Sequence, residues 1–277
     1  MAALPARVEQ KFFLAPDRLI LALALIRRTC RWDDEYREEQ INSLYFDTPQ
    51  LEQHERSLAG EFAKAKIRIR WYGTENDPQK YVGGTADSAL RSGCVPVWLE
   101  LKERRGFAST KQRIRFDVPT VALQPEALVK GIVPLSTLMT TIASFGFFVP
   151  QRLCPVIVIS YWRRRFVEPR TGFRVAIDSD IRSSVIMSGI GRGERGLRLA
   201  GAVAEIKGTS AELPVRLREL GDLGSSWTRF SKYSSSLTAH AGDLAGVSRL
   251  WPSGIVHAEQ CTGVPKSNRE VATCGNG

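Results

Sequence analysis

The sequence predicts an α+β fold in which an antiparallel eight-stranded β-barrel, closed or nearly closed, has its helices packed outside. Three observations predict this fold. Eight segments have the composition and the period of strands. These segments do not alternate with helices as regularly as a doubly wound parallel sheet requires. Strand after strand also carries one apolar face and one basic face.

Period-two alternation is clearest in the stretch AKIRIRWYG, residues Ala65–Gly73. Lys66, Arg68 and Arg70 fall on one side of this segment, and the two isoleucines and Trp71 fall on the other. Similar patterns recur along the chain. The eight expected strands are Arg7–Leu14, Ile41–Phe46, Lys66–Tyr72, Val97–Arg104, Lys111–Val118, Val156–Val167, Arg174–Asp180 and Val203–Gly208.

Helical patterns lie between some of these strands. Asp47 is expected to cap the helix that starts at Pro49. Periodicity is lost from about Gly242 onward, so we expect one domain over residues 1–241 and a disordered tail over residues 242–277. The expected helices are Pro16–Arg28, Pro49–Leu58, Gln124–Phe145 and Ala211–Leu220.

Composition narrows the class of partner. The 39 basic and 29 acidic residues give a net charge of +10, which predicts a polyanionic partner: nucleic acid, an anionic membrane surface or phosphorylated small molecules. Exposed aromatics interleaved with basic residues, as in nucleic-acid stacking platforms, are not evident, so we expect no nucleic acid partner. Five scattered cysteines without a CxxC motif indicate reduced thiols in a cytoplasmic protein.

The basic strand faces allow two arrangements. In one, the apolar faces form a core and the charged faces point to water. In the other, the sheet curls so that the charged faces line a channel, and the apolar faces pack outward against helices. The prevalence of arginine and the scarcity of carboxylates favour the channel, because a solvated face usually mixes both signs of charge.

Seven stretches occur in this order along the chain: NSLYFDTP, KIRIRWYG, WLELK, YWRRRFV, FRVAIDSDI, AEIKG and RFSKYSSSL. Together they resemble the VTC domain, the polyphosphate polymerase branch of the CYTH-like triphosphate tunnel metalloenzymes. The resemblance runs from about Arg7 to Leu237. Arg165 stands where that family usually has a small residue, which implies a narrower or more basic tunnel.

The resemblance implies a metal-dependent enzyme that transfers the γ-phosphoryl group of ATP to a growing polyphosphate chain, with Mn²⁺ or Mg²⁺ as cofactor. It implies Glu205 as the main metal ligand. Glu9 and Glu100 are either further metal ligands or charge partners of lysines, and Asp178 is expected to fix arginines. The implied catalytic residues are Lys11, Arg68, Arg70, Lys102, Arg163, Lys207 and Lys232, and the implied substrate-binding residues are Arg113, Tyr161, Arg174 and Ser231.

Three functions remain open at this point: polyphosphate synthesis from ATP, metal-dependent hydrolysis of a triphosphate, and binding of polyphosphate or a nucleotide without turnover. The longest apolar runs, Leu19–Ile26 and Pro155–Ser160, fall short of the roughly 20 residues of a membrane-spanning helix. The membrane helices of eukaryotic relatives are not found in this sequence. Any membrane link is therefore expected to come through a separate membrane protein partner.

Overall fold

A computed structural model describes residues 8–73, 93–106, 108–190, 196–223, 225–226, 230–241 and 256–258. Arg7, the first residue of the first expected strand, and Arg229, the first residue of the stretch RFSKYSSSL, lie outside the described residues. All eight predicted strands are present. They are β1 Val8–Leu14, β3 Glu38–Asp47, β4 Ala63–Tyr72, β5 Cys94–Arg105, β6 Ala108–Pro119, β7 Cys154–Val167, β8 Arg174–Val185 and β10 Ala202–Gly208.

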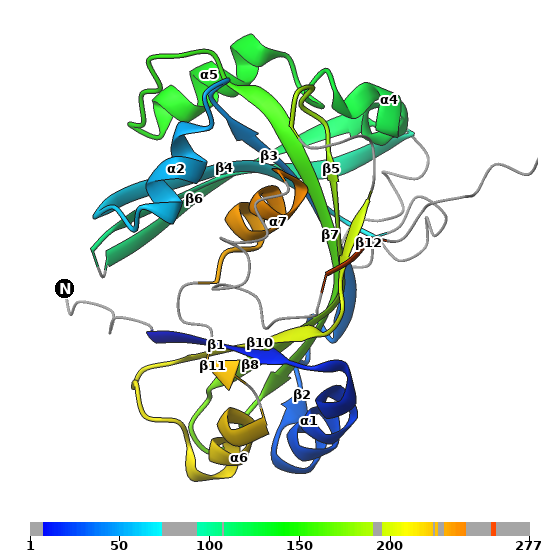
Figure 1. Cartoon of the computed structure of the whole chain (residues 1–277), viewed down its shortest axis with the longest axis vertical. Helices are drawn as coiled ribbons and strands as arrows, with labels where there is room; N and C mark the ends of the chain where they lie inside the picture. The colour runs from blue at the N-terminus through cyan, green and yellow to red at the C-terminus, as the bar shows by residue number, and fades with distance from the viewer. Residues whose placement is uncertain are drawn as a thin grey trace, which may run out of the picture.

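These eight strands form one antiparallel sheet, and the predicted fold class is confirmed. The hydrogen-bonded order is β1, β10, β8, β7, β3, β4, β5, β6. In Figure 1, β1 and β10 lie below and β4 to β6 lie above, with the long strand β7 between them, so the sheet curls around a central region. Among the described residues, no strand pairing joins β6 back to β1.

Two sets of helices cover the outer face of the curl. Near β1, β8 and β10, apolar residues of α1 (Pro16–Thr29) and α6 (Val215–Leu223) pack on outward-facing side chains such as Ile206. Near β4 and β5, α4 (Pro125–Leu128) and α5 (Leu135–Ser144) pack on Ile67 and Leu99. Outward-facing apolar residues on the strands therefore pack against helices, as the channel arrangement requires.

Three predicted helices differ from those observed. The segment Gln124–Phe145 is interrupted between α4 and α5, because Gly131 and Ile132 adopt positive φ angles of 93° and 66°. The second helix, α2, begins only at Glu52, after Leu51 with φ 59°. The third, α6, begins at Val215 rather than Ala211. The 3₁₀ helix η2 (Thr120–Leu123) precedes α4.

Helix α7 (Lys232–Ala241) is a feature that alternation did not predict. Its residues Tyr233 and Leu237 pack against Ile41, Ile159 and Val203, which face the inside of the curl. Figure 1 shows α7 at the centre of the curled sheet. The inside is therefore divided into an apolar part filled by α7 and a part lined by charged side chains.

Asp47 connects α7 to α2. Its carboxylate accepts hydrogen bonds from the backbone N–H groups of Gln53 and His54, both at 2.9 Å, and from the Tyr233 hydroxyl at 2.7 Å. The carboxylate thus satisfies N–H groups in the first turn of α2, as expected of a capping residue, although the helix starts later than predicted. It also holds α7 in its position inside the sheet.

Four short strands complete the sheet: β2 Arg31–Trp32, β9 Leu197–Leu199, β11 Ser225–Ser226 and β12 Val256–Ala258. Strand β12 pairs with β9. The other residues of the segment 242–277 lie outside the described residues, so the domain limit at residue 241 and the disordered tail stay predictions. Within the described parts, no helix is both long enough and apolar enough to cross a membrane.

Candidate active site inside the curled sheet

The sheet register brings opposite charges together on its inner face. Across the β1–β10 pair, Glu9 lies opposite Lys207 and Lys11 lies opposite Glu205. Arg68 lies opposite Glu100 in the β4–β5 pair, and Arg163 lies opposite Asp178 in the β7–β8 pair. Because side chains directly opposite each other are cross-strand neighbours, this register places each of these four cations beside a carboxylate.

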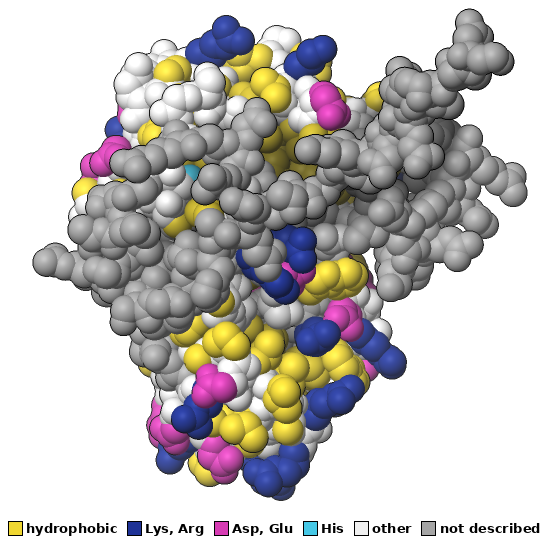
Figure 2. All heavy atoms as spheres, turned by 45° about the vertical axis from the view of Figure 1, so that its right-hand side comes forward, with side chains coloured by type: hydrophobic (Ala, Val, Ile, Leu, Met, Phe, Trp, Pro, Cys, Tyr) yellow, Lys and Arg dark blue, Asp and Glu magenta, His cyan; other side chains and the backbone are white. Residues whose placement is uncertain are grey.

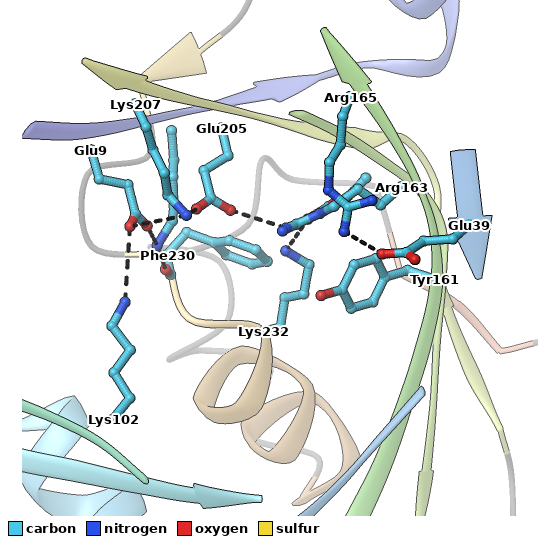
Figure 3. A network of polar contacts seen from close by, with 12 residues as sticks. Glu9, Glu39, Lys102, Tyr161, Arg163, Arg165, Glu205, Lys207, Phe230 and Lys232 are labelled. Carbon is cyan, nitrogen blue, oxygen red and sulfur yellow. Dashed lines mark hydrogen bonds and ion pairs between the residues drawn. The ribbon is translucent and has the colours of Figure 1, made fainter. Parts of the chain in front are cut away.

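One side of the interior, which we call the acid-rich wall, consists of Glu9, Lys11, Arg163, Asp178, Glu205 and Lys207 on β1, β7, β8 and β10, with Lys232 from α7. Arg163 donates to both carboxylate oxygens of Asp178, at 2.6 and 2.7 Å, and to Glu205 at 3.1 Å. Lys232 lies 2.5 Å from Asp178, and Lys207 lies 2.5 Å from Glu205. Figure 3 shows part of this network.

The opposite side, which we call the cation-rich wall, consists of Lys66, Arg68, Arg70, Glu100, Lys102 and Lys111 on β4, β5 and β6. Arg68 donates to one oxygen of Glu100 through two nitrogens, at 2.8 and 2.7 Å, and also to the Tyr45 hydroxyl at 2.9 Å. Lys111 lies 2.5 Å and Arg70 3.8 Å from the same carboxylate. One carboxylate therefore serves three cations on this wall.

Three contacts show that the two walls face one interior. Lys102 on β5 lies 3.8 Å from Glu9 on β1, although these strands are far apart in the sheet order (Figure 3). Lys66 lies 2.7 Å from the hydroxyl of Ser231, directly before α7, and Arg70 lies 3.4 Å from the Tyr161 hydroxyl on β7. The sheet thus curls far enough for side chains from both ends to meet.

The outer surface is charged in a different way. Arg28 of α1 lies 3.6 Å from Glu219 of α6, and Arg218 pairs with Glu212. In Figure 2, basic and acidic side chains lie side by side over the lower part of the molecule, with apolar side chains between them. This mixture is typical of a solvated surface, whereas the cation-rich wall is not mixed.

Burial and neighbouring charges shift the pKa values of the interior groups. Burial opposes the charged form of Glu205, but Arg163 and Lys207 hold its pKa well below the usual value. Burial likewise opposes ionisation of Glu100, and Arg68 and Arg70 nevertheless lower its pKa to about 2. These carboxylates are ionised at neutral pH.

Lys66 is shifted in the other direction. Burial lowers its pKa, and the neighbouring cations Lys11, Lys102 and Arg68 lower it further, to about 7. Alternation placed Lys66 with the basic face, but the family resemblance assigned it no role.

The candidate metal ligands divide between the two walls. Glu9 and Glu205 lie together: both contact Lys207, at 3.9 and 2.5 Å, and the charge of Glu205 acts on the pKa of Glu9. Glu100 lies on the other wall with its arginines. No group of three or more Asp, Glu, His or Cys residues within the described ranges could hold a metal ion.

Two carboxylates suit Mg²⁺ or Mn²⁺ when substrate phosphates and water provide the remaining oxygens. Glu9 and Glu205 therefore fit a divalent metal, and the paired Glu100 fits a role in charge balance.

The remaining predicted residues are placed as follows. Arg113 and Arg174 are exposed, and neither forms an ion pair with a described residue. Tyr161 is buried, and the ammonium group of Lys232 lies 4.8 Å from the centre of the Tyr161 ring. Arg165 pairs with Glu39 inside the curl, so this extra cation is balanced by an acid from β3.

Sequence reasoning missed the part that β3 and α7 have in the site. Tyr45 on β3 binds Arg68, and the backbone carbonyl of Phe230, just before α7, accepts from Lys11 at 3.2 Å. The alternation of Ser43 and Tyr45 with Leu44 and Phe46 was the available signal for β3. No local pattern indicated that the backbone at residue 230 would reach the interior.

A curled antiparallel sheet with helices outside and a cation-rich interior defines the class, a phosphate-handling enzyme of the triphosphate tunnel type. The particular family follows from the sequence, since residues 6–240 match the VTC domain. The chain belongs to the VTC domain family.

Comparison with curated proteins finds no match. Solved structures give distant likenesses. A proposed adenylyl cyclase from Hippeastrum, described with a dominant triphosphatase activity, is 15% identical with a TM-score of 0.38, covering 78% of this chain and 84% of that chain. Proposed adenylate cyclases from Vibrio parahaemolyticus and Bacillus halodurans are each 12% identical, with TM-scores of 0.35 and 0.42. Their alignments cover 89% and 92% of this chain, and 90% and 96% of theirs. At these TM-scores we draw no conclusion from them about this chain.

Proposed function

We propose that this protein is an ATP-dependent polyphosphate polymerase that transfers the γ-phosphoryl group of ATP to a growing inorganic polyphosphate chain inside the tunnel. The observation that carries the proposal is the charge of the cation-rich wall. Its five cations have one carboxylate, Glu100, on their own wall. A bound chain of phosphates would supply the missing negative charge, and arginine forks match phosphate oxygens well.

The exposure of the cations supports a long anionic ligand. The side chains of Arg70 and Lys232 are 9% and 11% exposed, whereas those of Lys102 and Lys207 are 43% and 40% exposed. The cations of the interior thus range from accessible lysines to nearly buried side chains. A polyphosphate chain can contact both sets at once, which a single orthophosphate cannot.

Phosphoryl transfer chiefly requires alignment of the reacting groups and neutralisation of charge. Arg68, Arg70 and Arg163 are held in place by carboxylates and hydroxyls before any ligand arrives. The acceptor is the terminal phosphate of the chain, which is already ionised, so polymer growth needs no strong base. Glu9 and Glu205 would hold Mn²⁺ or Mg²⁺, which when bound neutralises charge on the triphosphate.

The first experiment incubates the purified full chain with ATP and Mn²⁺, resolves polyphosphate on a stained gel and assays free phosphate in parallel. Glu205→Gln is the test variant. Glu38→Gln is the matched control, because Glu38 pairs with Arg164 on the outward face of β3 and β7 and is 40% exposed. We expect a ladder of polymer from the wild type and the control, and none from Glu205→Gln.

Other outcomes separate the alternatives. Free phosphate without polymer identifies a triphosphatase. Neither product, with tripolyphosphate binding intact, identifies a binding module. Tight DNA binding that tripolyphosphate does not compete would contradict the placement of the cations in the tunnel.

We also propose that the protein is located in the cytoplasm and that it works with a separate membrane protein. Cys30, Cys94 and Cys154 are free thiols among the described residues, in keeping with a reducing compartment such as the cytoplasm. We propose that any movement of the polymer across a membrane depends on a separate membrane protein.

A further inference from the structure

Lys66 and Ser231 form a pair that polymer growth does not require. The Lys66 nitrogen lies 2.7 Å from the Ser231 hydroxyl oxygen, within hydrogen-bond distance. Lys66 comes from β4, and Ser231 directly precedes α7, so the contact joins the cation-rich wall to the helix inside the sheet. A hydroxyl bound to an amine is the starting arrangement for a serine nucleophile with a lysine base.

The surroundings of Lys66 favour its neutral form. The charged groups with the largest effects on its pKa are all cationic: Lys11 on β1, Lys64 and Arg68 on β4, and Lys102 on β5. On α2, the charge of Lys66 acts on His54, whose own pKa is lowered by burial. No carboxylate among the described residues lies within ion-pair distance of Lys66. Its pKa of about 7 leaves much of it with a free lone pair at neutral pH.

Ser231 has a second contact that orients its hydroxyl. The backbone N–H of Ser234, in the first turn of α7, donates to the Ser231 oxygen at 3.3 Å. This N-cap contact fixes the oxygen at the start of the helix. The hydroxyl has one proton, and with the oxygen accepting from Ser234, that proton can be directed to neutral Lys66.

We propose that Ser231 is a phosphoryl acceptor, modified by the γ-phosphoryl group of a triphosphate bound in the tunnel, and that Lys66 takes the proton of its hydroxyl. The Ser231 oxygen forms a bond to the γ-phosphorus, and the bond from that phosphorus to the bridging oxygen breaks. ADP leaves with the bonding electrons, and the proton moves to the Lys66 nitrogen. The inference rests on the proposed function in that it requires ATP bound in the interior.

The product is stabilised where it forms. A phosphate on Ser231 lies at the N-terminus of a ten-residue helix, where backbone N–H groups and the helix dipole favour negative charge. Lys66, now protonated, becomes the ion-pair partner of that phosphate, and Lys11 and Lys102 are near. The phosphate formed on Ser231 thus gives Lys66 the negatively charged partner that it lacks before phosphoryl transfer.

The test uses the full chain with γ-labelled ATP and Mn²⁺, followed by denaturation, digestion and mass spectrometry of the peptide that contains Ser231. Ser231→Ala and Ser231→Asn remove the acceptor, and the asparagine keeps a side chain that can cap the helix. Lys66→Met and Lys66→Arg remove the base. Ser234→Ala is the matched control, because Ser234 is a buried serine of the same helix whose hydroxyl has no hydrogen-bond partner among the described residues.

We expect phosphate on Ser231 in the wild type and in Ser234→Ala, and none in the two Ser231 variants. Both Lys66 variants should be labelled at least about 100-fold more slowly, since general base catalysis contributes about 10²- to 10⁴-fold. The wild-type rate should rise as the pH passes about 7, where Lys66 loses its proton, and this rise should be absent in Lys66→Arg. A lysine that only positions Ser231 would leave the rise in place.

The results distinguish this inference from the polymerase. Polymer without phosphoserine overturns the inference and leaves the polymerase intact. Phosphoserine without polymer supports the inference and overturns the polymerase. Label on Ser231 that is unchanged in Lys66→Met overturns the role of Lys66. Neither product overturns both proposals.

Discussion

The acid-rich wall and the cation-rich wall face each other across one interior, yet they hold their cations in different ways. On the acid-rich wall, Glu9, Asp178 and Glu205 are distributed among four cations, and Arg163 is held by two of these acids. On the cation-rich wall, Glu100 is shared by three cations, while Lys66 has only a hydroxyl as partner among the described residues.

The difference indicates that the two walls have different roles in binding a ligand. The acid-rich wall is nearly neutral, so its cations are fixed in position and its carboxylates are available to a metal. The cation-rich wall has surplus positive charge in a partly buried place, which is costly without a ligand and favourable with a polyanion. One wall is therefore organised in advance, and the other provides most of the electrostatic attraction.

The largest expected effect tests whether Asp178 fixes the acid-rich wall. Asp178 is fully buried and binds both Arg163 and Lys232. Replacement by asparagine leaves two buried cations short of a partner, so we expect Asp178→Asn to lower the free energy of unfolding by about 3 to 5 kcal/mol in urea titrations. Asp117→Asn is the control: its pair with Arg115 is exposed, and its loss should cost at most about 1 kcal/mol. Equal losses in the two variants would contradict the comparison.

The second prediction concerns the single acid of the cation-rich wall. Glu100 has a pKa of about 2 in the folded protein against 4.5 ordinarily. The unfolded chain therefore binds more protons between these values, and the stability that Glu100 provides is present above pH 4.5 and is lost as the pH falls toward 2. We expect Glu100→Gln to cost ~3 kcal/mol at neutral pH. The deficit should vanish in the acid range.

Urea unfolding at a series of pH values measures this deficit. Glu126→Gln is the control, because Glu126 lies outside the interior on α4. A deficit that stays constant down to the lowest pH would show that the charge of Glu100 is not what stabilises the wall.

The third prediction concerns a substitution that should stabilise the folded protein, whereas the first two should destabilise it. Lys66 has a pKa of about 7 in the folded protein against 10.5 ordinarily, so the unfolded state binds more protons between these values and stability rises with pH across that window. Lys66→Met should remove this rise. At or below pH 7 it should raise the free energy of unfolding by about 1 to 2 kcal/mol, a value reduced for partial solvent screening.

Denaturant titrations at several pH values measure the change. If Lys66→Met is more stable than the wild type but no longer incorporates phosphate at Ser231, the substitution has increased stability at the expense of function. A less stable variant at neutral pH would contradict the view that Lys66 lacks a compensating charge.

The sequence was sufficient for the strands and for most of their faces, because strand geometry alone sets the period of two. Lys66 and Ile67 could be assigned to opposite faces without any knowledge of the fold. The contact between Lys102 and Glu9 could not be predicted, since it depends on how far the sheet curls. The role of Glu100 depends on a register that brings it opposite Arg68.

Helix α7 shows a different limit. Its run of serines has no apolar period, so its burial becomes evident only from the surface that it covers. The signal lay in the strands instead: Phe13, Ile159 and Val203 share the parity of the basic residues, and such apolar side chains need an apolar partner inside the curl.

The smallest expected effect concerns Lys102, which contacts the opposite wall through Glu9 at 3.8 Å. Its side chain is 43% exposed, and solvent screens charges at such positions. We expect Lys102→Met to weaken tripolyphosphate binding by only about two- to fivefold in calorimetric titrations, and less at high salt. Lys130→Met, on the outer surface near α4, is the control and should bind like the wild type. A loss above about tenfold would mean that Lys102 is desolvated when the ligand binds, and then the cation-rich wall would extend to the mouth of the tunnel as a closed surface around the chain.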